Sequence, residues 1–317
     1  MKQKLKTLLL VGGLATLTMH VLNRVEYSRC TSRNLLNNNQ NKYYEWRFGK
    51  IRYTIKGSGN PILLIHDLTV GSSSYEYHKL IDELSINHEV YSLDLLGYGL
   101  SDKPNMTYTN YLFVQMVSDF IKNIIGHKTD VIASGDSVPV AIMTCHNDSN
   151  LINNIIAINP QNLFQLNQIP SKQTRIMKFI LDTPIVGTFI YNLFTSKSKF
   201  TTSFQHKLYY NPYDIEEKSI LAYAEAAHTT DFHSKHTLAS YIGRYTNSNI
   251  VHALKEINKS IYIIAGEEKD NNHTIVENYE YYNQAIESVF IPKTKQLPHL
   301  EKEKEVLSHI QTFLSSQ

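Results

Sequence analysis

Runs of apolar residues alternate along this chain with segments that carry apolar residues at helical spacing. Four runs, at residues 61–65, 90–93, 131–133 and 155–158, are almost continuously apolar, which is typical of strands buried on both faces of a parallel sheet. The helical spacing occurs between them, over residues 75–84, 111–125 and 140–146. This alternation predicts an α/β fold with a mostly parallel central sheet and helices on both faces.

Further predicted strands lie before and after these four, and one long segment without strands separates the last two from the rest. Two short runs at 43–48 and 51–56 predict a hairpin that turns at Gly49 and Lys50. Strands at 261–265 and 289–291 follow a long gap, each with a predicted helix behind it, at 274–285 and 300–314. The gap, residues 161–259, is too long for a loop and is rich in aromatic residues. We expect a helical cap there and a core at 43–160 and 260–317, with extra helices on the sheet's flank as the alternative.

The N-terminus carries a different signal. Lys2, Lys4 and Lys6 precede an apolar stretch at residues 7–22, and no small-x-small cleavage site follows it. We therefore predict an uncleaved membrane anchor at 1–24 and a polar tether at 25–42, with a buried helix as the alternative. Basic residues flank the stretch on both sides, so the side of the membrane stays open.

Composition excludes some classes of function. The 31 basic and 29 acidic residues nearly cancel and form no run, so nothing favours binding to nucleic acid. The two cysteines, Cys30 and Cys145, are far apart, which argues against a disulfide framework and against a paired-cysteine metal site. We expect no cofactor and no metal; a site built from His228, His233 and His236 lacks a recognised ligand pattern.

One segment has a recognisable pattern. The sequence D-L-L-G-Y-G-L-S-D-K-P at residues 94–104 resembles the D-x-x-G-x-G-x-S-D-x-P loop of the alpha/beta-hydrolase superfamily, and in particular of capped members such as meta-cleavage-product hydrolases and esterases. Its glycines permit a tight reversal, so the motif is structural. The resemblance covers the chain beyond the tether and implies the alpha/beta-hydrolase fold.

The same resemblance implies a nucleophile and an oxyanion hole. G-D-S-V-P at 135–139 stands where the family carries its G-x-S-x-G elbow, which makes Ser137 the candidate nucleophile. Leu68, in the H-D-L segment after the third strand, and Val138 would donate the oxyanion-hole amides. Two residues depart from the pattern: Asp67 replaces a glycine, and Pro139 replaces a small residue. Asp136 as the nucleophile is a weaker alternative.

The positions at which the family carries its catalytic acid and its catalytic histidine hold other residues in this chain. The family's acid position after strand 261–265 holds Lys269, with Asp270 one residue later, and its histidine position holds Gln296. A serine hydroxyl needs an adjacent base, and glutamine cannot serve as one. His299 is the candidate base and Asp270 its partner. His206, His228, His233 and His236 are other bases that the sequence does not separate.

Two hypotheses for the function follow. In the first, the protein is a membrane-tethered hydrolase of the esterase or lipase type. It cleaves an ester, thioester or related acyl bond of a small apolar substrate, held in an apolar pocket beneath the cap. In the second, it is a catalytically degenerate hydrolase fold that binds a ligand or partner at the membrane. The departures at Asp67, Pro139, Lys269 and Gln296 favour the second, whereas Ser137 and the motifs around it favour the first.

Overall fold

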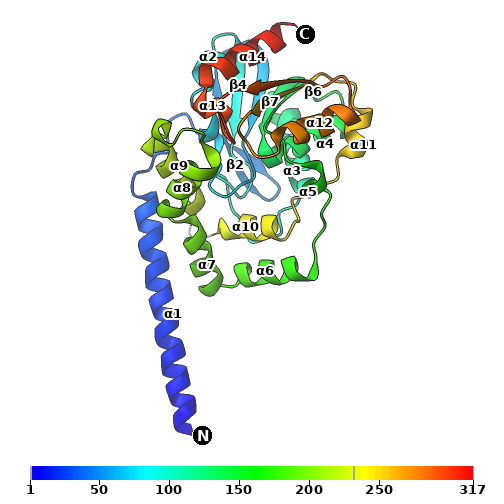
Figure 1. The fold of residues 1–317 in the computed structure, drawn as a ribbon. Helices are drawn as coiled ribbons and strands as arrows, with labels where there is room; N and C mark the ends of the chain where they lie inside the picture. The colour runs from blue at the N-terminus through cyan, green and yellow to red at the C-terminus, as the bar shows by residue number, and fades with distance from the viewer. Residues whose placement is uncertain (1, 231–232, 317) are drawn as a thin grey trace.

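The central element of the protein is a sheet of eight strands, seen in a computed structural model that describes residues 2–230 and 233–316 (Figure 1). The strand order is β1-β2-β4-β3-β5-β6-β7-β8. Strands β1 and β2 are antiparallel to their neighbours, and all the other pairs are parallel. The strands are β1 Lys42–Trp46, β2 Gly49–Lys56, β3 Asn60–Ile65, β4 His88–Leu93, β5 Thr129–Ser134, β6 Ile152–Ile158, β7 Ile261–Gly266 and β8 Glu287–Ile291. The predicted fold class is confirmed.

The central strands are buried on both faces because helices cover the sheet from both sides. Along β3, Leu63 and Ile65 join the larger apolar cluster, whereas Ile62 and Leu64 join the cluster on the other face. Side chains of successive strand residues point to opposite faces. The continuous apolar runs of the sequence are the direct result of this double coverage.

Each of the five helical segments predicted for the core contains a helix, in the predicted order, but the structure has more helices than were predicted. They are α2 Ile81–Leu84, α3 Asn110–Phe120, α4 Val138–Asn147, α11 Val251–Glu256, α12 Asn272–Tyr282, α13 Pro298–Glu301 and α14 Glu303–Ser315. The single helix predicted at 75–84 is wrong: a 3-10 turn, Ser74–Tyr77, precedes the short α2. This turn lets the buried Tyr77 hydroxyl donate to the Ile65 carbonyl at 2.9 Å.

The first hairpin turns two residues earlier than predicted. Trp46 pairs with Gly49, so Arg47 and Phe48 form the turn and Gly49 is the first residue of β2. Gly49 has a φ of +145°, which a side chain would make unfavourable there. The glycine is therefore needed beside the turn and does not lie within it.

Residues 161–259 are largely helical, as predicted. They contain α5 Leu163–Leu166, α6 Lys172–Asp182, α7 Val186–Thr195, α8 Lys197–Ser203, α9 Glu217–His228 and α10 Lys235–Ile242, before α11 returns to the core. Figure 1 shows α10 and α6 beyond one end of the sheet, with α10 nearer to it. We keep the term insertion for residues 161–259; their division from the core as a cap domain stays a prediction.

The N-terminal helix α1, Lys2–Thr31, projects from the body of the molecule (Figure 1). Its C-terminal part docks on the insertion, where Asn23 is buried and its amide oxygen accepts from Asn192 at 2.9 Å. The helix includes residues 25–31, which we assigned to the tether. Only 32–41 form a connection, and within it the Leu35 and Leu36 amides donate to the Glu225 carboxylate at 2.8 and 3.1 Å.

A membrane span is not evident in any one helix. Over the described residues, no single helix is both long enough and apolar enough to cross a bilayer. Helices α6 and α7, which meet at a bend of 100°, pass that criterion only when taken together. The predicted transmembrane anchor is therefore unsupported as a single spanning helix.

Candidate functional site

The turn that follows β5 places Gly135 at its apex, not Ser137. Gly135 has a φ of +53°, the left-handed conformation, and comes directly after the strand. Ser137 has a φ of −87° and stands at the start of α4. The strained residue of a nucleophile elbow is the one whose side chain projects over the sheet. In this chain that residue is a glycine, and the elbow spans residues 133–137 with Ala133 and Ser137 at its small positions.

The predicted nucleophile is therefore in the wrong place for attack. Ser137 has no solvent exposure, and its hydroxyl lies 2.8 Å from the Ser134 carbonyl and 3.1 Å from the Ile65 carbonyl. Both contacts are with main-chain acceptors, so the hydroxyl fastens the turn to the end of β3. The sequence held a signal for this register, because A-S-G-D-S satisfies the small-x-nucleophile-x-small spacing, whereas G-D-S-V-P ends on a proline.

A carboxylate occupies the oxyanion hole. Asp67 Oδ1 accepts from the Leu68 amide at 2.7 Å and from the Asp136 amide at 2.8 Å. The amide of the predicted donor Leu68 faces Asp67, whereas the amide of Val138 donates to the Gly135 carbonyl within the turn. The second amide that donates to Asp67 is that of Asp136, the residue after the apex. Both donors are thus already satisfied by a side chain of the protein.

The same carboxylate takes the space that a nucleophile would fill. A Cβ added to Gly135 would lie 2.4 Å from Asp67 Oδ1 and 2.5 Å from its carboxyl carbon. Real Cβ atoms essentially never approach that closely. Asp67 and a side chain at position 135 are therefore mutually exclusive without a rearrangement.

The predicted base is enclosed in a different network. His299 has no solvent exposure, its Nε2 lies 3.4 Å from Glu76 Oε1, and its ring stacks on Tyr77. Glu76 also accepts from the Ser134 hydroxyl and, at 3.1 Å, from the Asp67 amide. Burial alone would raise the pKa of Glu76, but His299 and the other donors hold it below its usual value. His299 therefore stabilises a buried carboxylate.

The predicted acid is also absent from the site. Asp270 is exposed and does not line the cavity described below. Lys269 lines it instead, with its ammonium 3.2 Å from the Asn159 carbonyl, and Gln296 lines it at the family's histidine position. The structure thus brings Asp67, Asp136, Lys269 and Gln296 together and separates Ser137, His299 and Asp270 from them.

These residues surround a cavity of about 250 Å³ at the end of the sheet. Leu208 is the one aliphatic residue among those that line it, and most of the other lining side chains carry a polar group. Its lining consists of Asp67, Thr69, Gly135, Asp136, Asn159, Gln161, Lys207, Leu208, Tyr241, Lys269 and Gln296. Such a lining suits a ligand with several hydrogen-bonding groups.

Burial sets the electrostatics of the cavity. It raises the pKa of Asp67 well above its usual value, and the neighbouring charges of Asp136 and Glu76 raise it further. Burial also raises the pKa of Asp136, against the opposing effect of hydrogen bonds from Gln161 at 3.1 Å and Tyr241 at 3.0 Å. Burial lowers the pKa of Lys269 to about 8. The charges of Asp67 and Asp136 oppose this lowering. Shifted pKa values of this kind are common among groups that line functional sites.

Comparisons with known proteins support the fold strongly and the activity less directly. A serine hydrolase involved in carbazole degradation has a TM-score of 0.70 with this chain, at 16% identity, over 87% of this chain and 99% of that one. A meta-cleavage product hydrolase from Pseudomonas fluorescens has a TM-score of 0.69 at 15% identity, over 87% and 97%.

This protein has the alpha/beta-hydrolase fold. The structure of this protein also resembles the crystal structure of a membrane phospholipase A. The likeness covers 100% of this chain and 99% of the phospholipase chain, with a TM-score of 0.69 and 17% identity. Helix α1 lies within that coverage. No family model matches the hydrolase-fold chain.

Curated relatives match only in part. A 2-hydroxy-6-oxo-6-(2'-aminophenyl)hexa-2,4-dienoic acid hydrolase of Metapseudomonas resinovorans is 35% identical over 72 residues, which are 22% of this chain and 25% of that protein. An uncharacterized protein of Mycobacterium tuberculosis is 26% identical over 165 residues, or 49% and 47%. The matches thus span half or less of these relatives. The names among the relatives and neighbours point to a hydrolase of the alpha/beta type, in line with the sequence.

The exclusion between Gly135 and Asp67 predicts an energetic coupling. Gly135→Ala should lower the free energy of unfolding by about 1–3 kcal/mol through backbone strain and overlap. In an Asp67→Gly background the loss should be smaller by about 1 kcal/mol or more, since the overlap is gone. Urea denaturation of the four proteins measures the cycle.

Gly126 offers a control for strain alone. It has a φ of +73°, and a Cβ there would meet nothing within 4 Å. Gly126→Ala should cost the same in both backgrounds. Additive effects of the Gly135 and Asp67 substitutions would contradict the placement of the carboxylate.

The lowered pKa of Lys269 predicts a dependence of stability on pH. Between about 8 and the ordinary value of 10.5, the unfolded chain binds the proton that the folded chain has released. The free energy of unfolding of the wild type should therefore rise over this range relative to Lys269→Met. Chemical denaturation at successive pH values tests this, with the exposed Lys172→Met as a surface control. A constant difference between wild type and Lys269→Met would show that the amine is not buried in the cavity.

Proposed function

We propose that this protein uses its hydrolase-type site to bind a small polar molecule, without a serine nucleophile. One observation carries the proposal: the Asp67 carboxylate satisfies both oxyanion-hole amides above a glycine. An acyl-transfer intermediate needs those donors free to stabilise its developing negative charge. With them satisfied, and with no side chain at the apex, covalent acyl transfer through the elbow lacks its two main contributors.

The ligand class follows from the cavity. Lys269 and Lys207 are cationic groups on its wall, Asp136 is a carboxyl group, and Asn159, Gln161 and Gln296 add amides that both donate and accept. A small molecule that carries both donors and acceptors would satisfy these groups.

Hydrolysis without a covalent intermediate is a second candidate, favoured by the shifted pKa values of Lys269 and Asp136. Both side chains line the cavity, where the Lys269 amine would take a proton from an attacking water and the Asp136 carboxyl group would supply one to the leaving group. This candidate retains the hydrolase chemistry to which the similar proteins point. It uses different residues from the Ser137, His299 and Asp270 set.

A fluorophosphonate probe and an ester substrate separate these mechanisms. We expect no labelling of the wild-type protein by the probe, since no activated serine faces the cavity. Ser137→Ala should leave any turnover of p-nitrophenyl acetate unchanged. If Asp136 and Lys269 act on water, Asp136→Asn should lower the turnover at least about tenfold; if the site only binds, neither variant changes the background rate. Labelling that disappears in Ser137→Ala would contradict the proposal.

We also propose that the protein associates with membranes through α1 and the insertion helices together. Helix α1 has exposed apolar residues along its free part, among them Leu10, Val11, Leu14 and Leu17. Helices α6 and α7 add Ile176, Met177, Phe179, Ile180, Val186, Leu193 and Phe194. Figure 1 shows α6 and α7 on the side of the body from which α1 extends. The exposed Lys172 and Arg175 on α6 suit anionic headgroups.

Flotation of the full chain with vesicles that contain phosphatidylglycerol tests this association. Phe179→Asp combined with Phe194→Asp should reduce the bound fraction several-fold, because each substitution places a charge in the apolar layer. The matched control is Tyr281→Asp, which changes an aromatic residue of α12 with 76% exposure. Equal loss in the control and the double variant, or no binding by the wild type, would rule out the α6 and α7 contact.

A further inference from the structure

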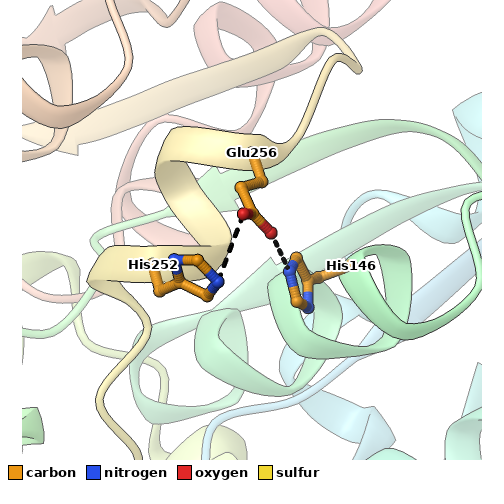
Figure 2. Close-up of side chains that lie close together, drawn as sticks. All are labelled: His146, His252 and Glu256. Atoms are coloured by element: carbon orange, nitrogen blue, oxygen red, sulfur yellow. Dashed lines mark hydrogen bonds and ion pairs between the residues drawn. The ribbon is translucent and has the colours of Figure 1, made fainter.

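A cluster of metal-binding side chains lies away from the cavity, where the insertion rejoins the core. Figure 2 shows His146, from the last turn of α4, facing His252 and Glu256 from α11. The Nε2 atom of His146 is 2.8 Å from Glu256 Oε2, and that of His252 is 3.2 Å from Glu256 Oε1. Two imidazoles therefore converge on the two oxygens of one carboxylate.

The arrangement has the donor set and nearly the spacing that a transition metal requires. One ligand atom from each of the three residues lies within 4.8 Å of the other two. Ligands bound to Zn²⁺ at about 2.0–2.2 Å lie roughly 3.3 Å from one another. Closing that difference takes small rotations, and the exposure of the His252 and Glu256 side chains, 77% and 52%, leaves them room to make these. Three protein ligands also leave a position for water.

The backbone beneath the cluster is held firmly. Residues four apart on a helix share a face, so α11 presents His252 and Glu256 side by side. Between them Ala253 and Leu254 are buried in the core. The Asn283 side-chain amide donates to the Leu254 and Ile257 carbonyls at 2.9 and 3.2 Å and secures the end of the helix. A preformed backbone lowers the entropic cost of gathering the ligands.

The charge of the cluster favours a cation between the three groups. The Glu256 carboxylate lies between the two imidazoles, and the His146 and His252 rings stand edge to face with centroids 5.8 Å apart. The unprotonated nitrogen of an imidazole can direct its lone pair at a metal. Binding would replace the contacts of both imidazoles with Glu256, and a ring nitrogen that coordinates the metal would give up any proton it carries to the other ring nitrogen or to solvent.

We propose that His146, His252 and Glu256 form a surface site for Zn²⁺ or a similar divalent transition metal. The site connects α11, the last helix of the insertion, to α4, the helix that begins at the elbow turn. A bound metal would therefore hold the end of the insertion against the helix that follows the turn containing Asp136. This role is structural and separate from the chemistry of the cavity.

Zinc binding by the full chain in detergent, freed of metal by a chelator, tests the site. We expect one zinc ion per chain in a competition titration with a chromophoric chelator, and a rise in the thermal midpoint on adding zinc. His252→Ala and Glu256→Gln should each weaken binding at least about tenfold and remove the rise. Both side chains are largely exposed, so the variants should fold.

His127→Ala is the matched control, because it removes another exposed histidine from the core. It should bind zinc as the wild type does. The proposal is overturned if the wild type binds no stoichiometric zinc, or if the two site variants retain wild-type affinity. It is also overturned if binding is lost instead in His236→Ala, which would place the metal against α10.

Discussion

The hydrogen bonds from the Leu68 and Asp136 amides to the Asp67 carboxylate determine the rest of the site. They join the loop after β3 to the turn after β5 and fill the space above Gly135. A buried carboxyl group is costly unless hydrogen bonds compensate for the lost water. These two amides provide that compensation, and in doing so they are withdrawn from the role that they have in acyl transfer.

Lys269 and Asp136 form one set of charged groups with the Asp67 carboxyl group. An ammonium group at the family's acid position would serve no purpose in a serine triad, but here it offsets the charge of two buried carboxyl groups. Tyr241 and Gln161 hold Asp136 from the insertion side of the cavity. The altered residues therefore form one coupled set, which is why we assign them a common binding role and do not treat them as separate losses.

Sequence reasoning found the scaffold but placed the elbow two residues too late. The glycine before Ser137 matched the first glycine of the family motif, and this match set the register. The structure shows that Gly135 itself has the left-handed conformation. Where β5 ends decides which residue reaches the apex, and a pattern of apolar residues defines a strand end only within a few residues. The proline at 139 was the local signal that the register was wrong.

By itself, the sequence determined the sheet, the order of its strands and helices, and the position of the insertion, because burial on both faces requires continuous apolar runs. It also identified Asp67, Lys269 and Gln296 as departures. Only the tertiary structure decided what these residues do, since Asp67 meets the Asp136 amide across 69 positions of the chain. That contact depends on how the ends of β3 and β5 align in the sheet, and the pairing of strands distant in sequence has no local signature.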